Sequence, residues 1–211
     1  MAENQRWYKG NLHMHSFWSD GVGFPEVGAR WFKERGYQFI AFTEHDQHQT
    51  GEHWVSVGDL QERGKEFQEI PTLRLYKELF CDSWVEVRED SLGQQVCLKP
   101  LYEYRHLLEE PEKFLILNGE EISVSSPQSP HWINVINAPV VILPQKSPES
   151  VADAVEQTIK AVEHGSQDSG RPVLVYFNHP NFLWNATAEE LAAARSLRFV
   201  EIHTALEDCH T

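Results

Sequence analysis

The chain has 211 residues and a formal net charge of −14 at pH 7, from 18 Lys and Arg against 32 Asp and Glu. This acidity argues against a protein that binds nucleic-acid backbones or lies on membranes through basic residues, because phosphates would repel it. A hydrophobic content of 41% argues against disorder, and no apolar run approaches the roughly 18 residues of a membrane span.

Three Cys without a paired short spacing favour a reducing compartment, so we predict a soluble, cytoplasmic protein. The eleven His are the unusual feature of the composition. Histidine accumulates where it binds metal or moves protons, so the positions of these residues can indicate the function.

Strands and helices are predicted to alternate along the chain. Apolar runs bounded by Gly, Pro or Asn predict strands at 11–15, 37–43, 114–117, 133–136, 173–177 and 199–202. A Pro near the first turn predicts helices at 24–36 and 147–165, and a capping box predicts a helix at 187–194. This alternation favours an α/β fold with a mostly parallel sheet or barrel. The polar stretch at about 47–99, with a hairpin of 84–87 and 95–98, is interpreted as an insertion in a single domain covering 1–211.

The first predicted strand carries His13 and His15, one residue apart. The period of two puts both imidazoles on one face, roughly 7 Å apart at Cα, which suits two ligands of one metal. Such a pair is equally compatible with chance on a surface or in a core. Asp20, in Ser19-Asp20-Gly21, taken alone fits a turn residue better than a ligand.

Three further candidates follow other predicted strands. His45 comes directly after the strand at 37–43, Glu121 after the strand at 114–117, and His179 after the strand at 173–177. Because the C-terminal ends of barrel strands converge on one face, we expect these side chains to share one site. Imidazoles and carboxylates without nearby thiolates indicate Zn²⁺, Mn²⁺ or Fe, with a Glu able to bridge two ions.

Four motifs occur in an order that resembles the polymerase and histidinol phosphatase (PHP) superfamily. They are Leu12-His13-Met14-His15 with Ser19-Asp20-Gly21, Phe42-Thr43-Glu44-His45-Asp46, Gly119-Glu120-Glu121-Ile122-Ser123, and Asn178-His179-Pro180. The flanking Asn181-Phe182-Leu183-Trp184 is similar to the branch that includes carbamate-ester metallohydrolases. The resemblance covers residue 11 to about residue 202.

The resemblance implies a distorted seven-stranded β/α (TIM-like) barrel with a centre of two or three divalent metal ions. By the family motif, His13 and His15 would bind the first ion, and Glu121 would bridge to a second ion held by His179. Asp20 and His45 would serve a third ion. No catalytic residue beyond metal-bound water is implied.

The sequence also departs from the family pattern. A further ligand His usually stands near an HxN sequence, but His131 is displaced by one residue relative to Asn134 and would need a β-bulge to point inward. The family closes its site with Asp-x-His at the tip of a last strand. Asp208 and His210 have this spacing but follow the preceding strand almost immediately, which favours coincidence over ligation. We therefore expect the last helix and strand to be missing, and keep these three residues as secondary candidates.

The leading hypothesis is a metal-dependent phosphoesterase that acts on a small phosphate ester through activated water. The absence of a Gly-rich phosphate loop is consistent with anion binding by metals. One alternative is a hydrolase of a carboxylic ester, carbamate or amide. Another is a truncated or degenerate metal-binding module without catalysis. No nucleic-acid or membrane partner is expected, and the oligomeric state is left open.

Overall fold

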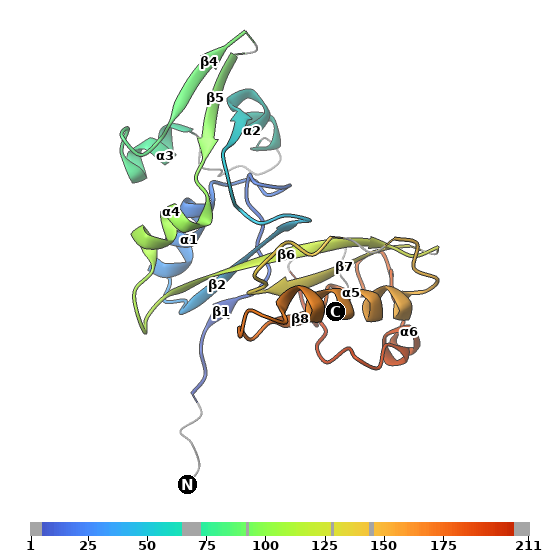
Figure 1. The fold of residues 1–211 in the computed structure, drawn as a ribbon. Coiled ribbons are helices and arrows are strands. Elements are labelled where there is room, and N and C mark those ends of the chain that lie inside the picture. Colours follow the sequence, from blue (N-terminus) through green and yellow to red (C-terminus); the bar gives the residue numbers. More distant parts are fainter. Residues whose placement is uncertain (1–5, 65–72, 92, 128, 144–145, 205–211) are drawn as a thin grey trace. The chain divides into compact units, whose positions relative to one another are not determined.

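The computed structural model describes residues 6–64, 73–91, 93–127, 129–143 and 146–204, which form two compact units. The first unit takes in residues 1–44 and 49–117, and the second takes in 45–48 and 118–211. Both helices and strands are present, so the predicted mixed α/β class is confirmed (Figure 1). Among the described helices, none combines the length and the apolar character that a membrane span needs.

The first unit begins with two parallel strands, β1 (Gly10–Asn11) and β2 (Phe39–His45). Helix α1 (Pro25–Glu34) connects them, with Pro25 at its first position, where the missing N–H costs no hydrogen bond. The apolar residues of β2 pack with α1 and with helix α4 (Leu101–Leu108) in one buried cluster. Burial of this cluster fixes β2, whose last residue, His45, already belongs to the second unit.

The stretch interpreted as an insertion forms a sheet of its own within the first unit. Its elements are β3 (His53–Ser56), α2 (Val57–Gly64), α3 (Leu73–Phe80), β4 (Val87–Asp90) and β5 (Gly93–Leu98). The strand order is β3-β5-β4 and all pairs are antiparallel. β4 and β5 form the predicted hairpin (Figure 1), but its first strand lies at 87–90 and not at 84–87. Tyr76 and Val96 are buried here against Phe17 and Phe24. The description of the whole chain as one domain with an insertion stays a prediction.

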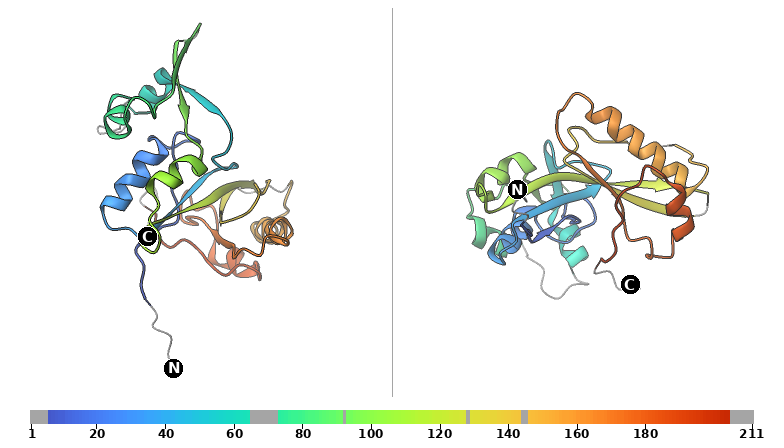
Figure 2. Two further views of the ribbon diagram at one scale, coloured as in Figure 1. Left: turned by 60° about the vertical axis from the view of Figure 1, so that its left-hand side comes forward. Right: turned by 90° about the horizontal axis from the view of Figure 1, so that it is seen from below.

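The second unit is built on three antiparallel strands, β6 (Leu115–Ser125), β7 (Pro130–Ile136) and β8 (Leu174–Phe177). The first three residues of β6 belong to the first unit. Helix α5 (Val151–Ser166) packs its apolar side against these strands (Figure 2). Helix α6 (Ala188–Ala193) starts with the predicted capping box of Thr187 and Glu190.

Several predictions about the strands need correction. Within the two units β1 and β2 pair in parallel and Phe177 and Val200 form a parallel bridge, but the other four strand pairs are antiparallel. The expectation of a mostly parallel sheet is therefore wrong for the described pairings. The cause is β6, which runs on to Ser125 and returns directly into β7, a connection that only an antiparallel pair allows. The segment at 199–202 contributes a single bridge, Phe177 to Val200, in place of a strand. The seven-stranded barrel is not confirmed.

Candidate metal centre

The first cluster consists of His13, His15 and Asp20, in the loop that follows β1. The Nε2 atoms of His13 and His15 lie 3.1 Å apart. The other ring nitrogen of His15, Nδ1, lies 3.3 Å from an Asp20 carboxylate oxygen. His15 is largely covered, with 20% of its side chain exposed, whereas Asp20 is 67% exposed. One imidazole therefore faces a second imidazole on one side and a carboxylate on the other.

Backbone contacts fix this loop although the strand ends at Asn11. The N–H of Met14 donates to the Thr43 hydroxyl, and the N–H of Thr43 donates to the Met14 carbonyl, so the loop continues along β2. Gly21 is required by close approach, because a Cβ there would lie 2.4 Å from the carbonyl carbon of His15. The Asp-Gly turn expected at 20–21 and a ligand position at Asp20 are thus compatible.

Glu44 is the buried anchor of the same loop. Its carboxylate accepts from the Ser16 N–H at 3.2 Å, the Ser16 hydroxyl at 2.5 Å and the Ser19 hydroxyl. A fourth donor is the Gln49 amide at 2.6 Å, and Gln49 in turn accepts from the Tyr104 hydroxyl. A buried carboxylate needs such donors to offset its lost hydration. Sequence reasoning missed Gln49 and Tyr104, and no local signal marks either residue.

The second cluster consists of His45, Glu121 and His179, all in the second unit. Oε1 of Glu121 lies 3.4 Å from His179 Nε2, and Oε2 lies 3.5 Å from His45 Nδ1. Glu121 and His179 are buried, with 2% and 6% of their side chains exposed, and His45 is 30% exposed. The two oxygens of one carboxylate therefore face two different imidazoles.

Strand pairing and side-chain hydrogen bonds hold this second cluster. Asp46 follows β2 with a positive φ of 53°, and its N–H donates to the Glu121 carbonyl. Its carboxylate accepts from the Ser123 N–H at 2.7 Å, which fixes His45 beside β6. The Asn178 amide donates to Glu121 Oε1 at 2.5 Å. Asn178 lies within a recognised motif, but its role in orienting Glu121 was not predicted.

Glu120 and Glu121 are neighbours in β6 and point to opposite sides, as the period of two requires. Glu120 accepts from the Ile142 N–H at 2.7 Å and lies 4.0 Å from His48 Nε2. Burial raises the pKa of Glu120 to about 8, against the lowering effect of that hydrogen bond. Burial also lowers the pKa of His48 to about 4. Burial thus favours the uncharged form of both groups, which separates Glu120 from the ligand candidate Glu121.

His131 does not join the second cluster. It pairs with Val124 in a regular β6–β7 ladder, so the bulge that would turn it inward is absent from these two described strands. Its ring is fully buried, bonded to the Ser126 hydroxyl at 2.7 Å and packed on Phe177. Trp132 instead takes the inward position and touches the His179 ring. Asp208 and His210 lie outside the described residues.

The spacing of the nitrogen and oxygen atoms fits divalent metal ligation. Two ligands about 2.05 Å from one tetrahedral zinc ion are roughly 3.3 Å apart. The Nε2 atoms of His13 and His15 are 3.1 Å apart, and the His179 Nε2 to Glu121 Oε1 distance is 3.4 Å. His15 with Asp20, and Glu121 with His179, thus each offer ligand atoms close enough to share an ion. Both clusters suit imidazole- and oxygen-binding ions.

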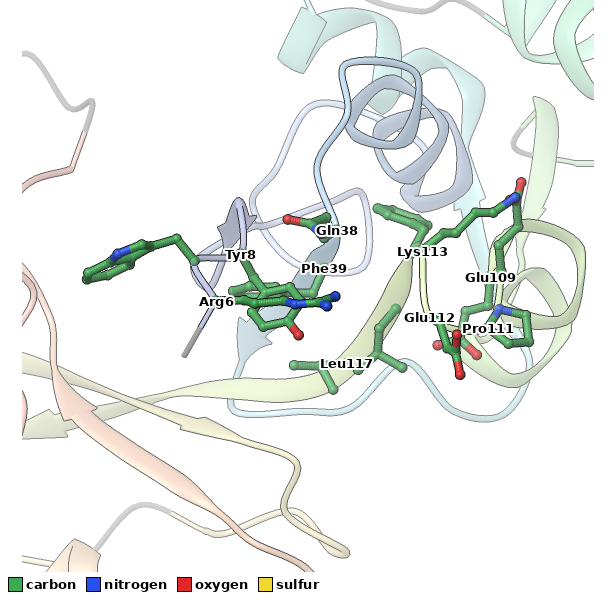
Figure 3. A pocket seen from close by; sticks show the side chains of 13 residues that line it. Arg6, Tyr8, Gln38, Phe39, Glu109, Pro111, Glu112, Lys113 and Leu117 are labelled. Carbon is green, nitrogen blue, oxygen red and sulfur yellow. The ribbon is translucent and has the colours of Figure 1, made fainter. Parts of the chain in front are cut away.

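A pocket in the first unit is lined by none of the ligand candidates. Its volume is about 810 Å³, and Tyr8, Phe39, Glu109, Glu112 and Leu117 are among the residues that line it (Figure 3). Glu109, Glu112 and Lys113 lie on one side of it (Figure 3), and Lys113 is paired with Glu110. Neither cluster contributes a side chain to this pocket, so we do not assign the chemistry there.

Comparison with known proteins returned partial matches, and no family model matches the chain. A stretch of 94 residues, 41% of this chain, is 30% identical to the DNA polymerase/3′-5′ exonuclease PolX of Bacillus subtilis. The match spans 16% of that protein.

Two solved structures each match 92% of this chain. One is a two-domain protein from Bacteroides vulgatus that contains a predicted PHP-like metal-dependent phosphoesterase, at 17% identity, a TM-score of 0.46 and 44% of its length. The other is a candidate metal-dependent phosphoesterase from Bifidobacterium adolescentis, at 11% identity, a TM-score of 0.41 and 77% of its length. The narrower resemblance to the carbamate-ester branch stays a prediction. Over 92% of its length the chain is similar to a protein that contains a predicted PHP-like metal-dependent phosphoesterase, the superfamily that its ordered motifs resemble.

Proposed function

We propose that the chain is a metal-dependent phosphoesterase that acts on a small phosphate ester. The observation that carries the proposal is the arrangement of Glu121, whose two buried oxygens each face a different imidazole. A carboxylate in this position is the usual bridge between two divalent ions. The proposed ligands are His13, His15, Asp20, His45, Glu121 and His179, which hold two or three ions of Zn, Mn or Fe. His131, Asp208 and His210 are left out of this set.

Each of the two clusters is proposed to bind divalent ions, and Glu121 is proposed to bridge two ions in the second cluster. Glu44, which anchors the loop of the first cluster, is followed directly in the chain by His45 of the second cluster. Divalent ions held there would polarise phosphoryl oxygens and lower the pKa of a bound water toward neutrality.

The side chains have separate tasks in this proposal. Glu121, held by the Asn178 amide, would be a ligand of two ions. Glu44 holds the loop that carries His15 and Asp20. The buried, uncharged pair of Glu120 and His48 adds no charge that would compete for the ions at neutral pH.

The test is turnover by the purified full chain loaded with Mn²⁺ or Zn²⁺. We expect hydrolysis of an aryl phosphate, inhibition by inorganic phosphate, and loss of turnover on chelation. An aryl acetate and an aryl carbamate are assayed in parallel with the same leaving group. Turnover of these esters without turnover of the phosphate would favour the alternative hydrolase. Stoichiometric metal without any turnover would favour a metal-binding module.

A further inference from the structure

A second pocket lies on the insertion, between β3, β5 and the start of α2. Its volume is about 440 Å³, within the range of small-molecule sites. It is lined by Trp54, Val55, Ser56, Asp59, Arg63 and Gln95. None of these residues has a part in the proposed metal centre, and all belong to the first unit.

Arg63 connects this pocket to the first cluster. One guanidinium N–H donates to the Ser19 carbonyl at 2.6 Å, directly before Asp20 in the chain. The Ser19 hydroxyl lies 3.3 Å from His15 Nδ1. Arg63 thus lines the pocket and also contacts the loop of candidate ligands.

Within the described ranges of the chain, the charge of Arg63 is not neutralised by a carboxylate. Among the residues that the structure describes, no acidic oxygen lies within ion-pair distance of its guanidinium, and the Ser19 carbonyl uses one of its five N–H donors. Its charge helps to lower the pKa of His53, after the larger effect of burial. The remaining donors form a planar fork that matches a carboxylate or phosphate.

A second guanidinium reinforces the positive charge at this pocket. Arg88 lies over the Trp54 ring at 4.1 Å and donates to the Gln95 side chain at 2.7 Å. Both partners are pocket-lining residues. Two arginines converge here although the whole chain carries an excess of 14 acidic residues over basic ones. Asp59, exposed on the same wall, is the opposing charge.

We propose that this pocket is a subsite for a second anionic group of the substrate, bound by the free side of Arg63. The proposal rests on the proposed function and narrows its substrate class to phosphate esters that carry a further carboxylate or phosphate. The metal centre then holds the phosphoryl group that is hydrolysed, and Arg63 selects substrates by the group at the other end.

The first test compares 4-carboxyphenyl phosphate with phenyl phosphate on the Mn²⁺-loaded full chain. The wild type is expected to favour the carboxylated ester in kcat/KM, and Arg63→Met to reduce this preference about tenfold or more, mainly through KM. Arg63→Lys keeps the charge but loses the fork, so it should restore only part of the preference. Arg74→Met, at an exposed arginine of α3, is the matched control. An unchanged preference in Arg63→Met would overturn the subsite.

The second test measures binding without catalysis. Benzoate is titrated into chelator-treated protein while the indole N–H signal of Trp54, assigned with Trp54→Phe, is followed by NMR. A saturable shift is expected in the wild type, weaker by about tenfold or more in Arg63→Met and stronger in Asp59→Asn, which removes a like charge. An equal shift in the wild type and Arg63→Met would contradict the proposal.

The two proposals fail separately. Arg63-dependent benzoate binding in a chain that hydrolyses no phosphate ester would remove the proposed function and keep the anion subsite. Hydrolysis with no dependence of preference or benzoate binding on Arg63 would keep the function and remove the subsite.

Discussion

The two ligand clusters are held in place by different means. In the first unit, His13, His15 and Asp20 lie on a loop, and the buried carboxylate of Glu44 fixes that loop through four donors. In the second unit, Glu121 is part of β6 itself, and strand pairing sets its position. A sheet fixes a side chain through many backbone bonds, whereas a loop depends on a few side-chain contacts. The first cluster should therefore be the more sensitive to single changes outside the ligands.

The largest effect is expected from Glu121→Gln. The amide keeps the size of the side chain but cannot bridge two cations with two anionic oxygens. We expect kcat/KM for an aryl phosphate to fall by at least about 100-fold, with loss of at least one bound metal equivalent by elemental analysis. Glu163→Gln, on the exposed side of α5, is the matched control. Full metal content and activity in Glu121→Gln would exclude a bridging role.

Glu44→Gln tests whether the loop depends on its anchor. One carboxylate oxygen becomes an amide donor that faces hydroxyl and amide donors, so buried hydrogen bonds are lost. We expect about 10- to 100-fold weaker metal binding, together with a loss of about 2–4 kcal/mol in the free energy of unfolding. Glu44→Asp keeps the charge and should bind metal more tightly than Glu44→Gln. The opposite order would mean that hydrogen-bond reach, and not charge, holds the loop.

Glu26 is a buried carboxyl of the first unit that belongs to neither cluster. Burial raises its pKa above 4.5, although hydrogen bonds from Tyr76 and Trp84 act in the opposite direction. A raised folded-state pKa gives stability that is present below the unfolded pKa and is lost as pH rises toward the folded value. Glu26→Gln should therefore gain stability relative to wild type above about pH 4.5, by up to about 1.4 kcal/mol per pH unit.

Urea unfolding of both proteins at about pH 5, 6 and 7 measures this trend. The exposed Glu110 is the contrast, because Lys33 and Lys113 hold its pKa below the usual range. Glu110→Gln should lose its difference from wild type as the pH falls, which is the opposite sign. A pH-independent difference for Glu26→Gln would show that the carboxyl is equally protonated in the folded and unfolded states.

The smallest effect is expected from His131→Leu. The ring is buried in the core away from Glu121, so metal content should be unchanged, and the free energy of unfolding should change by about 1–2 kcal/mol through the lost bond to Ser126. Elemental analysis and urea unfolding provide the two measurements. Loss of one metal equivalent would restore His131 as a ligand.

The sequence predicted the elements where local chemistry decides them. Pro25 starts α1, Thr187 and Glu190 form the capping box, and the apolar run of β2 is buried as expected. The expected parallel direction of strand pairing is wrong. Gly119 and the two glutamates after it are predicted to end a strand, but β6 continues through them. Local composition does not reveal how far a strand runs when tertiary packing buries its polar residues.

Residue type and order in the sequence identify the candidate ligands. They do not identify the residues that hold these ligands in place. His45, Glu121 and His179 stood out because imidazoles and acids followed apolar runs. Asn178, Gln49 and Tyr104 act only through contacts with residues distant in the chain. The displaced His131 was a useful signal, since the period of two already required a bulge that the regular β6–β7 ladder does not contain.

The most direct test of the central proposal asks whether ions of one chain are bridged by Glu121. The full chain is loaded with Mn²⁺ to saturation and its electron paramagnetic resonance spectrum is recorded. Two ions bridged by Glu121 predict an exchange-coupled multiline spectrum that reverts to the six-line signal of isolated Mn²⁺ in Glu121→Gln. A six-line spectrum from the saturated wild type would contradict a bridging role for Glu121.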